Sequence, residues 1–369
     1  MKMKENPTKS DANAALIELQ EVFADFPYAK PSHASVPIAA LLTLLGRPAI
    51  QGACPAFLFD ASTRGSGKTL QSDAISLIAT GRTSAKMAYP MHDEELEKVL
   101  GAYAIRGASL INFDNVARLF GGGPLDRCLT AEDYVELRIL GKSEIPTLRW
   151  RAVIVATGNN LALAGDTARR VLVARLESPL ENPEDRSDFR HPDLLGWVRQ
   201  EQVRLVWAGL TVLRAYFVAG RPDVGIKPWG SFGPWSQLVA AAIVHAGGAD
   251  PMDARPTVET DGEDQEKVAL GVVLRELARF DPSSEGVTTK GLVSSLYPAD
   301  YLKGQTTPDG WMDLREAIET LVPAKAGQAP DVRKVGDALR HAKGRVIGGR
   351  RLASAGHGQG GVAKWRVTA

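Results

Sequence analysis

The stretch "FLFDASTRGSGKTLQSDAISLIATG", residues 57 to 81, joins three different patterns. A run of apolar residues ends at Asp60, a loop of small residues ends in Gly67-Lys68-Thr69, and a helix-like pattern follows. Backbone N–H groups in such a loop, together with the N-terminus of the helix behind it, attract anions. The stretch therefore predicts a phosphate-binding loop between a buried strand and a helix.

This loop fits the pattern G-x-x-x-x-G-K-[ST], except that Ser62 stands at the first glycine position. Lys68 is expected to reach the outer phosphates of ATP, and Thr69 is expected to ligate Mg²⁺. The alternative is a flexible turn whose exposed lysine has no function. The strand and helix that flank the loop argue against this alternative. The residues expected to contact the nucleotide are Gly65, Ser66, Gly67, Lys68, Thr69 and Leu70.

Composition sets broad limits on the class of protein. The 369 residues are 44% hydrophobic and 24% charged, which suggests two or three domains with a large core. No apolar run approaches the roughly 18 residues of a membrane span, and the N-terminus lacks a signal-peptide pattern, so a cytoplasmic protein is expected. Cys54 and Cys128 are predicted to be buried thiols, because their spacing suits neither a disulfide framework nor a zinc site.

Between residues 55 and 177, short apolar runs alternate with helical patterns. This alternation predicts an α/β fold with a parallel sheet covered on both faces. The expected strands are residues 55–60, 85–89, 107–114, 151–157 and 170–176.

Two helices are predicted before the sheet, at residues 11–26 and 35–50. The first is expected to be capped by Asp11, and the second is expected to have a proline in its first turn. The predicted domain order is an N-terminal helical collar at 1–50, an ATPase core at 51–190, a helical lid at 191–249, an acidic linker at 250–264 and a C-terminal domain at 265–369.

A second motif is "SLINFDN", an apolar strand that ends in Asp114 and Asn115. A carboxylate at this point can hold Mg²⁺ through water opposite Thr69, as a Walker B aspartate does. The glutamate that usually follows and polarises the attacking water is replaced by Asn115. Glu94 and Glu95 are the nearest candidate substitutes, and a solvated helix face is an equally good interpretation of both.

Two further motifs follow along the chain. "AVIVATGNN" is a strand ending in Asn159, whose amide could orient the lytic water or contact the γ-phosphate, although the sequence is also a good turn. In "GDTARRVLVARLE", Arg169 and Arg170 precede the last strand. Either arginine could stabilise charge on the γ-phosphate from a neighbouring subunit, or pair with surface carboxylates instead.

The C-terminal end carries an uneven share of the charge. Residues 329–369 contain nine Lys and Arg residues and two Asp residues, a local charge of +7 on a chain whose net charge is +1. A helix with an apolar stripe precedes two strands, "RVIGGRRLA" and "GVAKWRVTA", around a glycine-rich tip, which is typical of a winged helix that binds duplex DNA. The residues of the stripe are Val332, Val335, Leu339 and Ala342. Packing against the chain's own ATPase part is the alternative. The expected DNA contacts are Arg333, Lys334, Arg340, Lys343, Arg350 and Arg351.

In their order and spacing, the four motifs resemble the AAA+ helicase modules of primase–helicase proteins from phages and integrated mobile elements. That family is related to MCM and superfamily 3 helicases. The stretches "RILGKSEIPTL", "KPWGSFGPWSQLV" and the C-terminal tail also look like it, so that the resemblance covers roughly residues 20 to 369.

The resemblance implies a ring, commonly a hexamer, that binds ATP with Mg²⁺ between neighbouring subunits. Arg169 or Arg170 would be the arginine finger of the next subunit. The residues expected on the other side of the interface are Lys68, Thr69, Asp114 and Asn159.

It also implies that "RILGKSEIPTL" is a hairpin whose tip points into the ring channel, where Lys142 would grip a phosphate of single-stranded DNA. Ser62 and Asn115 depart from the family pattern, so the resemblance does not identify the catalytic carboxylate. No primase or polymerase fits in the short segment before the ATPase core, so a separate protein is expected to supply that activity.

The sequence thus predicts an ATP-dependent DNA helicase or translocase for replication of a phage or mobile element. A DNA-binding initiator or loader that uses ATP as a switch is a second possibility, because Asn115 suits slow hydrolysis. A remodeller that does not act on nucleic acid is a third, against which the basic tail argues.

Overall fold

A computed structural model of the chain describes eight stretches and divides into two units, Met1–Thr257 and Val258–Ala369, which are treated separately. The described stretches are residues 4–63, 65–138, 145–178, 186–256, 261–298, 310–324, 328–357 and 363–368.

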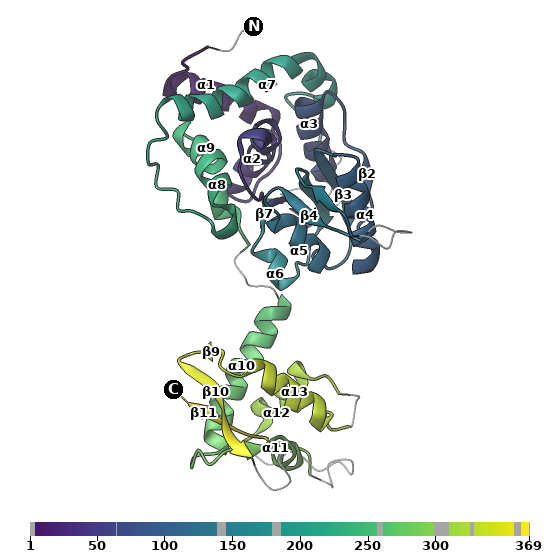
Figure 1. Ribbon diagram of the computed structural model, residues 1–369, viewed down its shortest axis with the longest axis vertical. Helices are drawn as coiled ribbons and strands as arrows, with labels where there is room; N and C mark the ends of the chain where they lie inside the picture. Colours follow the sequence, from purple (N-terminus) through teal and green to yellow (C-terminus); the bar gives the residue numbers. More distant parts are fainter. Residues whose placement is uncertain are drawn as a thin grey trace. The chain divides into compact units, whose positions relative to one another are not determined.

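The first unit is built on a five-stranded parallel sheet with the strand order β2-β3-β6-β1-β7 (Figure 1). These strands lie where the sequence predicted them, and the α/β fold with a parallel sheet is confirmed. The strands are β1 (Ala56–Ala61), β2 (Lys86–Met87), β3 (Leu110–Val116), β6 (Val153–Asn159) and β7 (Val171–Leu176). Since β6 lies between β1 and β3, its end is beside both the phosphate loop and Asp114.

Helices cover both faces of this sheet. Phe57 and Phe59 of β1 point to one face and Leu58 points to the other, because successive side chains of a strand alternate. The first face packs on α1 (Lys9–Val22), α2 (Pro31–Gly46), α3 (Lys68–Thr80) and α7 (Leu194–Val218). The second face packs on α4 (Asp93–Ile105) and α5 (Gly123–Thr130).

The two N-terminal helices begin earlier than the sequence predicted. Thr8 rather than Asp11 caps α1: the Thr8 hydroxyl accepts from the Asp11 backbone N–H, and the Asp11 carboxylate accepts from the Thr8 N–H. This reciprocal capping box uses Asp11 as its third helical residue. In α2 the first-turn proline is Pro31, which leaves Pro37 inside the helix.

The chain after the sheet packs into the same hydrophobic cluster as α1 and α2. Trp235 is fully buried there, and its Nε1 donates to Thr43 Oγ1 of α2 at 2.8 Å. The elements after the sheet are the 3₁₀ turn η3 (Gly230–Phe232), α8 (Gly233–Trp235), a π-helical turn η4 (Ser236–Ala240), α9 (Ala241–His245) and the 3₁₀ turn η5 (Pro251–Ala254). A further 3₁₀ turn, η1 (Arg47–Ala49), follows α2.

The functional separation of collar, core and lid stays a prediction. The boundary between the two units falls within the predicted 250–264 linker.

Two short elements complete this unit. Strands β4 (Tyr134–Glu136) and β5 (Thr147–Arg149) pair antiparallel on either side of the stretch that the family resemblance implied to be a hairpin before the Asn159 strand. Lys142, expected at its tip, lies outside the described residues. The short helix α6 (Gly165–Ala168) precedes β7.

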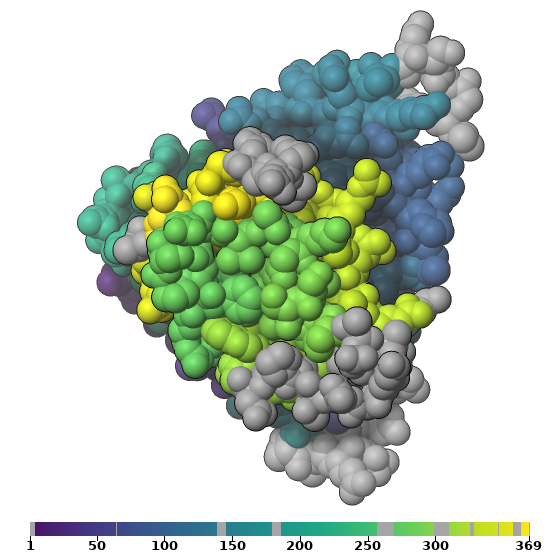
Figure 2. All heavy atoms as spheres, turned by 90° about the horizontal axis from the view of Figure 1, so that it is seen from below, coloured from purple at the N-terminus to yellow at the C-terminus, as the bar shows by residue number. Residues whose placement is uncertain are grey.

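The second unit combines helices with a four-stranded antiparallel sheet in the order β8-β11-β10-β9. Figure 2 looks onto a face where residues in the green part of the colour bar, from 261 to 298, lie beside C-terminal residues, in yellow, and α10 contacts β9, β10 and β11. The helices are α10 (Asp261–Phe280), α11 (Thr289–Leu296), α12 (Met312–Leu321) and α13 (Val332–Ala342). The strands are β8 (Val287–Thr288), β9 (Val346–Ile347), β10 (Arg350–His357) and β11 (Ala363–Thr368).

The predicted C-terminal hairpin differs in one detail. Gly348 and Gly349, with φ of 56° and 74°, turn the chain between β9 and β10, so that "RVIGGRRLA" holds two strands rather than one. In α13, Val335, Leu339 and Ala342 are buried as expected, but Val332 is 39% exposed. Within the described residues, no helix is both long and apolar enough to cross a membrane, and both cysteines are buried.

Candidate functional site

The predicted phosphate loop connects β1 to α3, and Lys68 is the first residue of that helix. Gly65 and Gly67 have φ of 71° and 83°, a region that glycine enters without strain. A Cβ at position 67 would lie 2.7 Å from the ring of Phe26, so the loop also needs glycine there for space. Ser62 has no positive φ, which explains why a residue with a side chain is accepted at the first glycine position.

The Lys68 ammonium lies inside the loop. Its Nζ donates to the Thr63 carbonyl oxygen at 3.0 Å and to Ser66 Oγ at 2.8 Å. Burial lowers the pKa of Lys68, the charge of Arg175 lowers it further, and the Asp60 carboxylate opposes both. A phosphate oxygen would restore the charge stabilisation that Lys68 loses on leaving water.

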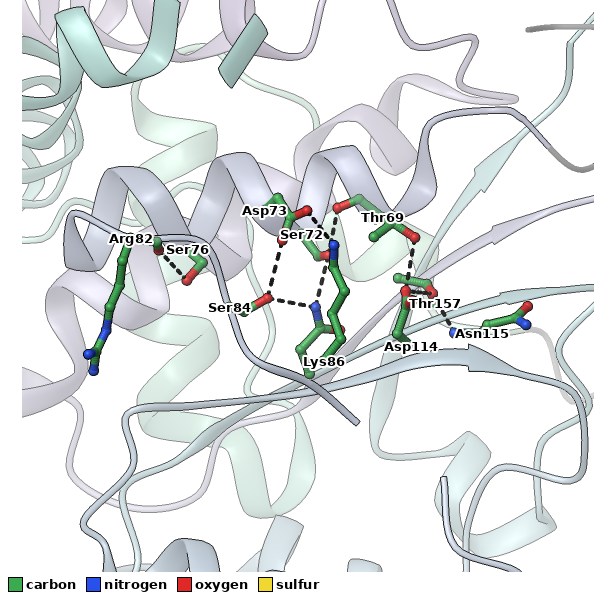
Figure 3. Close-up of polar contacts among 11 residues, drawn as sticks. Thr69, Ser72, Asp73, Ser76, Arg82, Ser84, Lys86, Asp114, Asn115 and Thr157 are labelled. Carbon is green, nitrogen blue, oxygen red and sulfur yellow. Dashed lines mark hydrogen bonds and ion pairs between the residues drawn. The ribbon is translucent and has the colours of Figure 1, made fainter. Parts of the chain in front are cut away.

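The ends of β3 and β6 meet the start of α3 (Figure 3). Asp114 Oδ1 accepts from Thr69 Oγ1 at 2.9 Å and from Thr157 Oγ1 at 2.8 Å. The Asn115 backbone N–H donates to Thr157 Oγ1 at 2.9 Å. A hydroxyl and a carboxylate in contact at the mouth of a phosphate loop are oxygen donors of the kind that Mg²⁺ takes beside nucleotide phosphates, so these residues fit the metal.

A polar network lies beside this contact, between α3 and the sheet, with Ser72, Asp73 and Asn112 buried (Figure 3). Asn112 Nδ2 donates to Ser72 Oγ at 3.1 Å and to Ser84 Oγ at 2.8 Å, while Lys86 pairs with Asp73 at 2.8 Å. No motif in the sequence pointed to these residues, although a polar Asn112 inside an apolar strand was a usable signal. The network fixes α3 against β2 and β3, which sets the position of Thr69 relative to Asp114.

At the end of β6, Asn159 is half-buried beside the phosphate loop. Its Oδ1 is buried and has no hydrogen-bond partner among the described residues. The next residue, Asn160, accepts at Oδ1 from Arg175 Nη2 at 2.9 Å, and Arg175 also pairs with Asp60. No motif in the sequence assigned a role to Asp60 or Arg175, although each is a single charge in an otherwise apolar strand.

The two arginines before β7 have different surroundings. Arg170 Nη1 pairs with Asp166 at 2.9 Å and with Asp126 at 3.3 Å. Arg169 caps α6, is exposed, and makes no ion pair within the described residues. The structure thus separates two residues that the sequence left equivalent.

The candidate catalytic glutamate is not brought to the site by any described contact. Glu95 pairs with Lys98 at 2.6 Å on the exposed side of α4, and Lys98 also approaches Glu94 at 3.6 Å. The side chain of Asn115 is exposed at the end of β3, with a left-handed backbone φ of 53°.

A cavity of about 900 Å³ borders the phosphate loop. Gly65 to Gly67 form one wall, and the segment after α1, including Phe26, forms another. Phe189 and Arg186 come from the segment before α7, with the Arg186 guanidinium 4.9 Å from the Phe189 ring centre. No motif in the sequence pointed to this cavity, because its walls come from distant parts of the chain.

In the second unit the predicted DNA contacts lie on the surface. The Asp331 carboxylate caps α13 by accepting from the backbone N–H groups of Arg333 and Lys334, whose side chains are exposed. Arg340 pairs with Asp337 at 2.7 Å. The remaining exposed cations of the predicted set are Lys343, Arg350 and Arg351.

No family model matches this chain, and no curated protein matches it. Among solved structures, the chain is similar to the apo NrS-1 C-terminal region, at 13% identity and a TM-score of 0.45, over 100% of this chain and 79% of that one. It is also similar to an active helicase, SCCmec type IV Cch, at 12% identity and a TM-score of 0.39, over 96% and 69%. The JCV helicase matches at 14% identity and a TM-score of 0.25, over 72% and 73%. Values this low do not assign a function, which therefore depends on the site itself.

Proposed function

We propose that the chain is an ATP-driven helicase or translocase acting on DNA, in replication of a phage or mobile element. The observation that carries the proposal is the meeting of Lys68, Thr69 and Asp114 at the carboxyl edge of one parallel sheet. Lys68 is held in a glycine-rich loop at a helix N-terminus, and Thr69 is 2.9 Å from the Asp114 carboxylate. This arrangement suits a nucleoside triphosphate with Mg²⁺.

In the proposed reaction, water displaces ADP from the γ-phosphoryl group, and the protein acts by positioning and charge. Lys68 would hold the outer phosphates, while Thr69 and Asp114 would hold Mg²⁺. When bound, this ion would supply positive charge to the phosphate oxygens. The Asn159 amide orients the attacking water or contacts the γ-phosphate, and Arg169 of a neighbouring copy stabilises the charge that develops.

The cavity of about 900 Å³ would take the base and sugar of the nucleotide. Its wall of phosphate-loop residues is continuous with the phosphate site. Phe26 and Phe189 offer aromatic surface, which suits a planar base. The proposal therefore puts the nucleotide's base between the segment after α1 and the segment before α7, both of which line the cavity.

The second unit would bind duplex DNA. Helices α11 and α13 followed by the β10–β11 pair, with β8 alongside β11, have the order of elements expected for a winged helix. Exposed Arg333 and Lys334 open α13 with their charges toward solvent. Lys142, which follows β4 and precedes β5 in the sequence, would contact single-stranded DNA in the channel of a ring, by resemblance alone.

A DNA-binding initiator or loader that is switched by ATP is the second candidate. It is favoured by Asn115 at the position of the usual glutamate and by the surface ion pair that holds Glu95. Slow hydrolysis would suit such a switch. Substitution of Glu95 by Gln tests whether Glu95 is the catalytic base. An unchanged rate of ATP hydrolysis would exclude Glu95 from that role.

Strand displacement on a forked DNA duplex distinguishes the two candidates. The helicase proposal predicts ATP-dependent unwinding that is lost in Lys68→Ala and retained in Lys9→Ala, an exposed lysine far along the chain from the loop. ATP-dependent assembly on DNA without any unwinding would contradict it and support the switch.

A further inference from the structure

A pair of opposite charges joins two apolar strands beside the phosphate loop. Asp60 is the penultimate residue of β1, and Arg175 of β7 lies directly opposite it in the parallel register. Asp60 is 7% exposed, and its Oδ2 pairs with Arg175 Nη1. The two strands are already joined along six residues, so their pairing does not require this ion pair.

Both members of the pair also hold the turn that follows β6. Asp60 Oδ1 accepts from the Leu161 backbone N–H at 3.1 Å, and Arg175 Nη2 donates to Asn160 Oδ1 at 2.9 Å. The Asn160 backbone N–H donates to the Ala61 carbonyl oxygen at 3.1 Å. Asn160 is thereby tied to β1 and β7 through both its backbone and its side chain.

Asn160 needs such support because of its backbone. Its φ of 48° is in the left-handed region, which few residues other than glycine adopt, and which asparagine tolerates better than most. Asn159 immediately precedes it, and the buried Oδ1 of Asn159 has no partner among the described residues. The direction of the Asn159 amide is therefore set mainly by the backbone of this turn.

We propose that Asp60 and Arg175 are positioning residues for ATP hydrolysis, which act through Asn160 to hold the Asn159 amide at the phosphate site. This inference rests on the proposed function. Apolar residues in place of Asp60 and Arg175 would stabilise the packing of the two strands equally well, since buried ion pairs add little net stability. The hydrogen bonds to the β6 turn give the pair a role in geometry that apolar residues could not supply.

The test is a double-mutant cycle on ATP turnover by the full chain. Arg175→Gln is made alone and in the Asn159→Ala background, and kcat is measured beside the dissociation constant of ATP. A loss of kcat of about 10- to 100-fold is expected for Arg175→Gln alone, because small misplacements of an active group have effects of this size. The same substitution is expected to change kcat less than about twofold when Asn159 is already absent.

Asn160→Gly provides a second variant that leaves the ion pair intact. Glycine accepts the left-handed backbone, so this change removes only the acceptor for Arg175, and we expect the same kcat loss with ATP affinity retained. Ser284→Gly is the matched control, because Ser284 also has a left-handed φ, of 55°, and lies in the second unit. Turnover of this control should equal that of the unsubstituted protein.

Equal effects of Arg175→Gln with and without Asn159 would overturn the positioning role, as would full turnover in Asn160→Gly. Weaker ATP binding in Arg175→Gln that persists without Asn159 would also overturn it, since Arg175 would then contact phosphate directly. The proposed function is judged separately, by whether the unsubstituted protein shows turnover that Lys68→Ala abolishes. Without such turnover, both proposals fail.

Discussion

The proposed phosphate site of the first unit and the basic surface of the second unit are built in opposite ways. In the first, Lys68 and Asp114 are each held by two hydrogen bonds: Lys68 by two oxygens of its own loop, and Asp114 by two hydroxyls. In the second, Arg333 and Lys334 stand exposed on a helix whose apolar side is packed in the core. The first depends on exact placement, whereas the second depends on the number of cations.

This difference has a physical basis. Catalysis of phosphoryl transfer needs donors placed within a few tenths of an ångström, so that losing one group loses most of the rate. Binding to a polyanion comes largely from counterion release, which is a sum of similar contributions. Substitutions of the residues that hold the nucleotide should therefore act nearly all-or-none, whereas substitutions on the basic surface of the second unit should act by degrees.

The largest effect is expected from Lys68→Ala. Removal of the ammonium that neutralises the outer phosphates should lower ATP turnover about 100-fold or more. Turnover is measured by phosphate release, with Lys9→Ala as the control for loss of one lysine charge. Turnover within threefold of that of the unsubstituted protein would contradict the contrast between the two units, because the Lys68 ammonium would then be dispensable.

The two arginines before β7 should respond differently. Arg169→Ala removes an exposed group with no ion pair in the described part of the chain, and turnover of the assembled protein should fall about 10³-fold while the melting temperature is unchanged. Arg170→Ala leaves Asp126 without its cation, so it should instead lower the free energy of unfolding by about 1–3 kcal/mol. Both are measured by phosphate release and thermal unfolding, and the reverse pattern would make Arg170 the finger.

A graded effect is expected for the basic surface. Arg333→Ala combined with Lys334→Ala should weaken duplex DNA binding and reduce the slope of log affinity against log salt by about 2, one unit for each phosphate that the protein no longer neutralises. Fluorescence anisotropy over a salt series measures the slope. As the control, Lys9→Ala combined with Lys30→Ala removes the same charge from the first unit. If this control reduced the slope by the same amount, net charge alone would govern DNA binding.

The smallest effects concern the packing of the first unit. Burial raises the pKa of Cys54 to about 11 and that of Cys128 to about 12. Because the folded pKa is raised, the stability from these neutral thiols is present below the unfolded value of about 8.5 and is lost as pH rises toward 11. Alkylation at pH 8 should be slow until the protein unfolds, and the melting temperature should fall between pH 9 and 11. Fast alkylation of the native protein would show that Cys54 or Cys128 is accessible to solvent, which would contradict their burial in the first unit.

The sequence was sufficient for the features that depend on local pattern. The five strands, the glycine-rich loop between β1 and α3, and the position of Asp114 near the end of β3 follow from apolar runs bounded by turn residues, and the structure places them accordingly. The cap of α1 was misplaced by three residues because both Thr8 and Asp11 are good caps, and only their reciprocal hydrogen bonds decide between them.

Contacts between distant segments could not be predicted in this way. The pairing of Asp60 with Arg175 depends on β7 lying next to β1, which strand order alone determines. Likewise, Arg169 and Arg170 differ only because Asp126 of α5 approaches one of them. The catalytic base also could not be identified from the sequence, because Asn115 stands where the usual glutamate would be. The Glu95→Gln experiment addresses its identity.

The most direct test of the central claim is ATP hydrolysis by the full chain with and without single-stranded DNA, using Lys68→Ala as the blank. A motor requires its nucleotide site and its DNA path to be coupled, so we predict strong stimulation of turnover by DNA and its loss in Lys68→Ala. Tight ATP binding with negligible turnover that DNA does not change would contradict the motor and leave an ATP-controlled switch.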